Sequence, residues 1–212
     1  MIERILPPEV RVAEAREDPP DVALFPAEEA LIRRAVDKRR REFGTGRWCA
    51  RRALRELGVA DAPLLRDERG APRWPDGVLG SITHCDGYRA AAVVRAGRWR
   101  ALGIDAEPDS PLPGGVGEVI ALPEERRALA ALGTDLPWDR ILFSAKESVY
   151  KAWYPLTRAW LEFEQARVEL DPAGTFRAEL LVPPPLVDGE PLTGFSGRWH
   201  REGGVVVTAV VR

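Results

Sequence analysis

The chain has 212 residues, of which 45% are hydrophobic and 30% charged, an ordinary globular composition with enough apolar material for one large domain or two small ones. Its formal net charge of −2 gives no reason to expect a nucleic-acid partner. No apolar run is long enough to span a membrane, and the first residues lack the pattern of a signal peptide. The two cysteines, Cys49 and Cys85, are too few for a disulfide framework and lack zinc-binding spacing, so we expect a reducing, cytoplasmic setting.

The first quarter of the chain predicts a short strand followed by two helices. Residues 1–25 are rich in proline and acids, with an apolar run that predicts an early strand. A proline followed by two glutamates begins a helix over residues 26–43. Gly44-Thr45-Gly46 predicts a break, and a second helix over residues 47–57 ends at Gly58.

Positive charge is concentrated in these two predicted helices. Residues 33–55 contain ten Arg or Lys against two acidic residues. Such a local excess favours an anionic ligand. The alternative is that the arginines, including Arg47 and Arg51 on one helix face, form a solvated basic surface.

Two short strands are predicted next, over residues 78–83 and 89–95, with His84 in the turn between them. A turn of this kind can bind phosphate through its exposed amides. The alternative is that His84 is simply a capping or core histidine.

A predicted strand over residues 99–107 contains two acids, Asp105 and Glu107, two positions apart. Side chains at this spacing leave the same face of a strand. Two such carboxylates repel one another unless a cation lies between them, and Mg²⁺ suits oxygen ligands of this kind. The alternative is an edge strand with two solvated acids.

Residues 138–154 predict a helix, which Pro155 ends. Glu147 and Lys151 are four apart on one face, with Lys146 beside them. They form either a surface ion pair of little energetic value or a third metal carboxylate beside two phosphate-binding lysines.

The remaining segments predict a connector and two hairpins. Residues 110–117 form a proline- and glycine-rich loop, which is either a docking surface or a flexible connector. A further helix begins at Pro123. Hairpins are expected over residues 166–182 and 194–211.

Two of these segments together resemble a known family. Gly-Ile-Asp-Ala-Glu at residues 103–107 and Phe-Ser-Ala-Lys-Glu-Ser-Val-Tyr-Lys at residues 143–151 resemble the two signature motifs of the 4′-phosphopantetheinyl transferases, in the family's order and about forty residues apart. Thr83-His84 resembles a third family element. The resemblance covers nearly the whole chain and is closest to the actinobacterial members of the two-lobed, surfactin-synthetase-activating class.

The resemblance implies an α+β fold of two similar lobes, related by a pseudo-twofold axis, each with helices on a small, mostly antiparallel sheet. The expected N-terminal lobe is residues 1–102 and the C-terminal lobe residues 103–212, packed as one compact unit with the active site at the junction. We expect a monomer, because two lobes in one chain can complete a site alone.

The implied reaction transfers 4′-phosphopantetheine from coenzyme A to a serine of an apo acyl or peptidyl carrier protein, with release of 3′,5′-ADP. Mg²⁺, or Mn²⁺, is the implied metal. Its implied ligands are Asp105, Glu107 and Glu147. Glu147, directly or through a metal-bound water, and Lys151 are the implied catalytic residues. The implied coenzyme A ligands are Arg47, Arg51, Arg69, Thr83, His84, Lys146 and Lys151.

Two other functions remain open from the sequence. The chain could be a binding module for carrier proteins or coenzyme A that does not catalyse transfer, although the complete set of acids and lysines argues against this. A different nucleotide phosphotransferase is disfavoured, because the chain has no P-loop or glycine-rich nucleotide loop.

Overall fold

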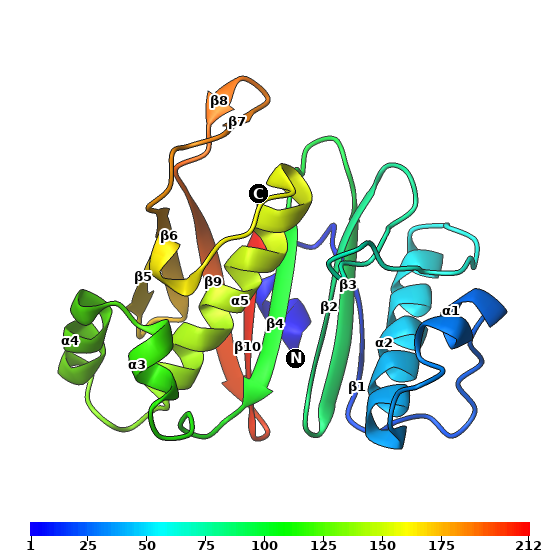
Figure 1. Cartoon of the computed structure of the whole chain (residues 1–212), viewed down its shortest axis with the longest axis horizontal. Coiled ribbons are helices and arrows are strands. Elements are labelled where there is room, and N and C mark those ends of the chain that lie inside the picture. The colour runs from blue at the N-terminus through cyan, green and yellow to red at the C-terminus, as the bar shows by residue number, and fades with distance from the viewer.

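The computed structural model describes residues 1–212 and has two α+β lobes side by side (Figure 1). Each lobe has one 20-residue helix lying on a small antiparallel sheet, which confirms the predicted fold class. The sheets differ in size, with three strands in the N-terminal lobe and five in the C-terminal lobe. None of the helices is both long and apolar enough to cross a bilayer.

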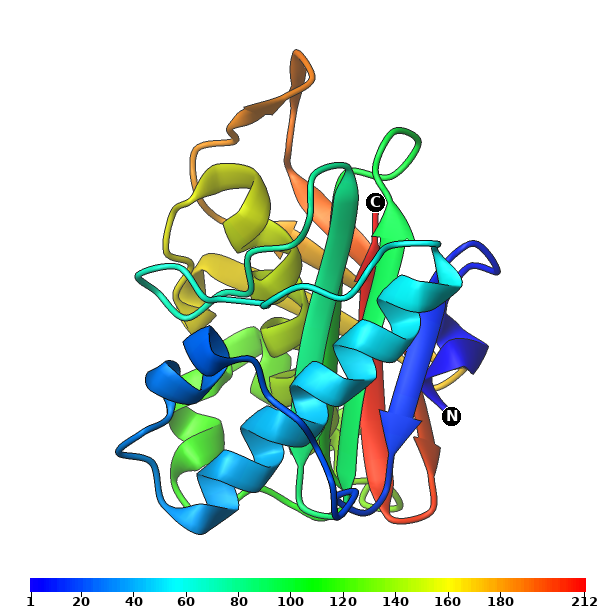
Figure 2. The ribbon, with the colours of Figure 1, turned by 90° about the vertical axis from the view of Figure 1, so that its right-hand side faces the viewer.

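The N-terminal lobe contains a three-stranded sheet covered by a long helix (Figure 2). Its elements are the 3₁₀ helix η1 (Ile2–Ile5), β1 (Arg11–Ala15), α1 (Pro26–Leu31), α2 (Asp37–Glu56), β2 (Val78–Cys85) and β3 (Tyr88–Arg95). The strand order is β1-β3-β2, all antiparallel. Small residues of α2 pack against the sheet, among them Ala50, Ala53 and the free Cys49.

The helix boundaries in this lobe differ from the prediction. The predicted break at Gly44-Thr45-Gly46 is wrong, because α2 runs through it without interruption and the break lies at residues 32–36. A Cβ atom on Gly46 would lie 3.1 Å from Ile82 Cγ2. The glycine therefore allows α2 to lie close against β2, and tertiary packing outweighs the low helix propensity of glycine.

The C-terminal lobe contains a five-stranded sheet in the order β4-β10-β9-β6-β5, with every neighbouring pair antiparallel. Its helices are α3 (Val116–Ile120), α4 (Pro123–Ala131), α5 (Trp138–Thr157) and the 3₁₀ helix η2 (Phe163–Gln165). Its strands are β4 (Leu102–Pro108), β5 (Ala166–Asp171), β6 (Thr175–Leu180), β7 (Leu186–Val187), β8 (Glu190–Pro191), β9 (Gly194–Glu202) and β10 (Val205–Val211). The two predicted C-terminal hairpins are confirmed.

Pro155 does not end α5, as the sequence suggested. The helix continues to Thr157 and ends at Arg158, which has a left-handed conformation with φ 57°. Its backbone N–H donates to the carbonyl of Tyr154 at 2.8 Å. Pro155 lies in the last turn, where only one backbone hydrogen bond is lost.

The lobes meet where β2 lies beside β4, and side-chain hydroxyls replace the missing backbone ladder. The Ile104 N–H donates to Ser81 Oγ at 3.1 Å, and the Ala106 N–H donates to Thr83 Oγ1 at 2.9 Å. Buried residues of both lobes, including Tyr88 and Ile104, share one apolar cluster across this junction. The predicted boundary after residue 102 falls at the start of β4 and stays a prediction.

Gly103 allows the backbone of α5 to lie close against the backbone of β4. A Cβ atom at this position would lie 2.0 Å from the Ser148 carbonyl oxygen and 2.7 Å from the Ala152 nitrogen. Both atoms are backbone atoms of α5, so neither can rotate away. Helix α5 can therefore lie directly on β4 only because residue 103 has no side chain.

We predict that Gly103→Ala destabilises the fold by about 3 kcal/mol, because the added methyl group forces α5 away from β4. The melting temperature should fall by about 10 °C, measured by circular dichroism. Gly117→Ala is the matched control: residue 117 lies in α3 with nothing within 4 Å of the added Cβ, so this variant should melt at or above the wild-type temperature. Equal melting temperatures for Gly103→Ala and the wild type would contradict the packing argument.

Candidate active site

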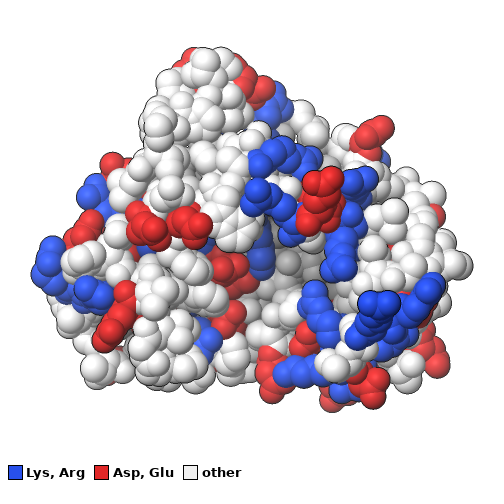
Figure 3. All heavy atoms as spheres, viewed as in Figure 1, with Lys and Arg blue, Asp and Glu red and all other residues white.

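A cavity of about 250 Å³ lies between the lobes. Its walls come from α2, β2 and the loop before β2 on one side, and from α5 on the other. Figure 3 shows a hollow between the lobes with Lys and Arg side chains gathered along its rim. The cavity contains Arg39, Arg47, Arg69, His84, Glu147 and Lys151 among its lining residues.

Asp105 is buried beside this cavity and held by residues from both lobes. Its Oδ1 accepts hydrogen bonds from Lys151 Nζ at 2.7 Å and Thr83 Oγ1 at 3.2 Å. Its Oδ2 accepts a hydrogen bond from Ser144 Oγ at 2.8 Å. A carboxylate that is only 4% exposed needs such partners, because an unpaired buried charge is very costly.

Glu107 and Glu147 lie near Asp105, and each has a raised pKa. Burial raises the pKa of Glu107, and the charge of Asp105 raises it further, against the opposing effect of Arg140. Arg140 Nη1 donates to Glu107 Oε2 at 2.7 Å. Burial also raises the pKa of Glu147, with Lys151 acting in the opposite direction. The other two carboxylates add to this rise, so three acids share one electrostatic environment.

The donor set suits a hard divalent cation, since it consists of carboxylate oxygens whose mutual repulsion such an ion would relieve. The side-chain arrangement itself is not a preformed three-carboxylate cluster: no group of three or more His, Cys, Asp or Glu residues is placed to hold a metal. Instead, Lys151 forms an ion pair with Asp105, and Arg140 forms one with Glu107. A metal bound here would displace or share these contacts.

Helix α2 presents a basic face to the cavity. Arg47 is buried, donates from Nε to the Leu64 carbonyl at 2.8 Å and lies over the Phe43 ring at 4.2 Å. Burial lowers the pKa of Arg47 to about 10, against the attraction of Glu28, so it is still charged at neutral pH. A buried guanidinium with no carboxylate bonded to it is suited to bind an anion from the cavity.

His84 lies at the edge of the same cavity. Its Nε2 is 2.8 Å from Arg39 Nη1, and its Nδ1 is 3.7 Å from Glu42 Oε2. Burial lowers the pKa of His84, an effect that Glu42 opposes and Arg39 reinforces. Because an arginine can only donate, His84 accepts at Nε2 as the neutral imidazole and leaves the positive charge on Arg39.

Three predicted coenzyme A ligands have other partners in the structure. Arg51 Nη1 donates to both oxygens of the fully buried Glu28, at 3.0 and 2.9 Å. Lys146 Nζ is buried against Glu125 Oε2 at 2.8 Å and donates to the carbonyls of Phe163 and Ala166. Thr83 is 2% exposed and bonds to Asp105 and Ala106, as described above. None of the three lines the 250 Å³ cavity, although Lys146 lines the smaller pocket that adjoins it.

The prediction missed Arg39, Tyr150 and Tyr154, which line the cavity. Arg39, Phe43 and Arg47 are each four residues apart, which places them on one helix face. That signal was present in the sequence, but the predicted break after Phe43 separated the residues into two helices. The tyrosines lie on α5 one turn apart, beside the charged residues from which the site was predicted.

A second, smaller pocket of about 150 Å³ adjoins the first on the C-terminal side. Glu147 and Tyr150 line both pockets, and Trp160, Leu161 and Phe163 add apolar walls to the second. The site therefore continues from a basic end, near α2, to an aromatic end, near η2.

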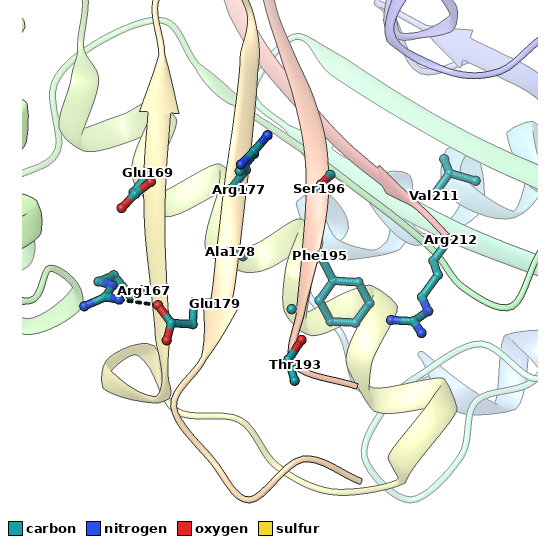
Figure 4. A pocket seen from close by; sticks show the side chains of 11 residues that line it. Arg167, Glu169, Arg177, Ala178, Glu179, Thr193, Phe195, Ser196, Val211 and Arg212 are labelled. Carbon is teal, nitrogen blue, oxygen red and sulfur yellow. Dashed lines mark hydrogen bonds and ion pairs between the residues drawn. The ribbon is translucent and has the colours of Figure 1, made fainter. Parts of the chain in front are cut away.

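A larger and more open hollow of about 740 Å³ lies elsewhere, on the face of the C-terminal sheet (Figure 4). Its charged side chains come from β5, β6 and Arg212 after β10, and Arg167 pairs with Glu179 within it. None of the motif residues lines this hollow. Its size alone does not make it a site.

Comparison with known proteins agrees with this geometry. Residues 27–94 match the 4′-phosphopantetheinyl transferase N-terminal domain, and residues 101–207 match the 4′-phosphopantetheinyl transferase superfamily. The chain is 55% identical to the 4′-phosphopantetheinyl transferase Svp of Streptomyces mobaraensis, over 99% of this chain and 88% of that protein. It is 51% identical to Npt of Nocardia iowensis, over 99% of both chains.

A third relative, the 4′-phosphopantetheinyl transferase PptT of Mycobacterium tuberculosis, is 49% identical over 94% of this chain and 90% of that protein. The matches extend across both lobes and include the strand and the helix that carry the two motifs. On this evidence the chain belongs to the 4′-phosphopantetheinyl transferase superfamily.

Proposed function

We propose that the protein transfers 4′-phosphopantetheine from coenzyme A to a serine of an apo acyl or peptidyl carrier protein and releases 3′,5′-ADP. The reaction would take place in the cavity between the lobes. The observation that carries this proposal is the position of Asp105, which is bonded to residues of both lobes and to Lys151 at the cavity. Two further acids, Glu107 and Glu147, share its electrostatic environment.

The basic end of the cavity would bind the phosphates of coenzyme A. Arg39 and Arg47 provide guanidinium groups from one face of α2, and His84 and Arg69 contribute from β2 and the preceding loop. Arginine suits this role because its planar fork binds phosphate bidentately. The aromatic end, with Tyr150, Trp160 and Phe163, would accommodate the less polar pantetheine arm.

Mg²⁺ is the metal that fits the donor chemistry best, with Mn²⁺ as the alternative. Asp105, Glu107 and Glu147 would hold it. When bound, it would neutralise charge on the pyrophosphate and polarise the reacting phosphorus.

Residues of the chain would accept the proton of the serine and neutralise the charge of the leaving group. The carrier serine oxygen forms a bond to the phosphorus that bears pantetheine, and the bond from that phosphorus to the oxygen of the leaving 3′,5′-ADP breaks. Glu147, which lines the cavity, would accept the serine proton directly or through a water molecule. Lys151 has three N–H donors, of which one is used by Asp105, so the others can neutralise the leaving phosphate.

The carrier protein would approach from the side of α3, where the short helix presents Val119 at 75% exposure. The loop before α3 adjoins the acids, because Arg140 donates to Glu107 and also to the carbonyls of Ser110 and Pro111. We expect a monomer in the cytoplasm, where the buried thiols of Cys49 and Cys85 stay reduced.

We predict that Glu147→Gln lowers kcat about 10²–10⁴-fold, because the isosteric amide cannot accept the serine proton. Intact mass of an apo carrier protein after incubation with enzyme, coenzyme A and Mg²⁺ measures transfer, and calorimetry should show that coenzyme A still binds. Glu124→Gln, on the exposed surface of α4, is the matched control and should transfer normally.

An EDTA arm of the same experiment should abolish transfer by the wild type. No mass gain by the wild type with several carrier proteins, while coenzyme A still binds, would favour the non-catalytic binding module.

We predict that two neighbouring arginines give opposite results. Arg47→Gln should raise KM for coenzyme A about tenfold, because it removes a phosphate contact. Arg51→Gln should instead destabilise the protein by about 3–5 kcal/mol, because it leaves Glu28 buried without its partner. Steady-state kinetics and thermal melting distinguish these effects. A large rise in KM for Arg51→Gln in a fully folded variant would restore Arg51 as a ligand.

A further inference from the structure

A tight turn of the N-terminal lobe reaches across the cavity to the other lobe. It lies in the loop between α2 and β2, and Figure 2 shows this loop extending to the C-terminal end of α5. Asp67 builds the turn: its Oδ1 accepts hydrogen bonds from the backbone N–H groups of Arg69 and Ala71, each at 3.0 Å. Gly70 has a φ of +88°, a conformation that favours glycine and completes the turn.

The second carboxylate oxygen of Asp67 is bonded to the C-terminal lobe. Its Oδ2 accepts from the Tyr154 hydroxyl at 2.8 Å and from Arg158 Nη1 at 3.1 Å. Both donors lie at the end of α5, 87 and 91 residues further along the chain. One side chain therefore shapes a turn in one lobe and attaches it to the other.

The turn carries Arg69 to the rim of the cavity. Its guanidinium carbon lies 5.7 Å from the centre of the Trp160 ring, which belongs to the C-terminal lobe. Arg69 is exposed and forms no ion pair, so its charge is available to an anion in the cavity. The ring restricts where the guanidinium can lie, and the anchored turn restricts where its backbone can lie.

We propose that Asp67 is a positioning residue that anchors this turn on α5 and thereby holds Arg69 and the adjoining wall of the cavity in the geometry that binds coenzyme A. This rests on the proposed function for the identity of the ligand. Asp67 does not line the cavity, so it acts through the turn. Tyr154 lines the cavity and donates to Asp67, so the anchor and the cavity wall share a residue.

Two variants test the anchor. Asp67→Asn keeps an oxygen for the turn's N–H groups, but its amide nitrogen cannot accept from the Tyr154 hydroxyl or attract Arg158. Tyr154→Phe removes only the hydroxyl and keeps the aromatic wall. Each variant should raise KM and the calorimetric Kd for coenzyme A about fivefold to tenfold, while kcat at saturating coenzyme A and KM for the carrier protein stay within about twofold.

The double variant should be no worse than Asp67→Asn alone, because the hydrogen bond that Tyr154→Phe removes is one that Asp67→Asn has already lost. Hydrogen exchange at the amides of residues 66–72 should be faster in each variant. Asp61→Asn is the matched control: it makes the same chemical change in the same loop, but Asp61 pairs with Arg55 of its own lobe. It should leave coenzyme A affinity and exchange at residues 66–72 unchanged.

Wild-type affinity for coenzyme A in both variants would overturn the proposal, as would an equal effect of Asp61→Asn. An equal loss of kcat, carrier KM and coenzyme A affinity would also overturn it, because a general loss of structure has that signature. Should Asp67→Asn fail to fold, Tyr154→Phe decides alone. If the wild type binds coenzyme A but transfers nothing, the proposed function fails, and the affinity and exchange measurements still decide whether the anchor exists.

Discussion

The burial of Asp105 at the junction of the lobes is the constraint on which the rest of the site depends. A carboxylate removed from water must be bonded on all sides, and here one partner, Thr83, comes from the N-terminal lobe while Ser144 and Lys151 come from α5. The Thr83 hydroxyl also accepts the Ala106 N–H, so it joins the lobes where no strand ladder does. The lobes must therefore pack correctly before the acid is satisfied, and the active site and the lobe interface form together.

The two motifs pack against each other in register because two residues of a strand cover nearly the same length as four residues of a helix. Along one face of β4, Gly103 meets the backbone at Ser148, Asp105 bonds Ser144, and Glu107 bonds Arg140. Two strand residues advance about 6.7 Å and four helix residues about 6 Å, so successive positions stay in step along the antiparallel pair. The alternating motif in the strand thus matches a four-residue spacing in the helix. The glycine at its start allows the backbones to come close enough for the side chains to bond.

Sequence patterns identified the basic helix and the motif lysine but could not tell which cations face the ligand. Arg47 and Arg51 lie one turn apart on the same helix, yet one lines the cavity and the other neutralises Glu28. Lys146 and Lys151 belong to one motif, yet Lys146 forms a buried ion pair with Glu125 of α4. A buried cation takes the nearest acid that packing supplies, and these acids lie 23 and 21 residues away in the sequence. Local periodicity contains no information about such pairs.

The sequence by itself determined the elements that depend on local chemistry: the β2–β3 hairpin, the alternating acids of β4, the helical face that carries Glu147 and Lys151, and, through its motifs, the family. Tertiary structure alone decided the rest. Gly46 is a helix breaker by propensity and a packing residue in fact, because Ile82 lies where its side chain would be. Thr83 resembles a phosphate ligand but is turned toward Asp105 by the lobe junction. In each case the deciding contact joins residues distant in sequence, and its free energy exists only once the lobes have packed together.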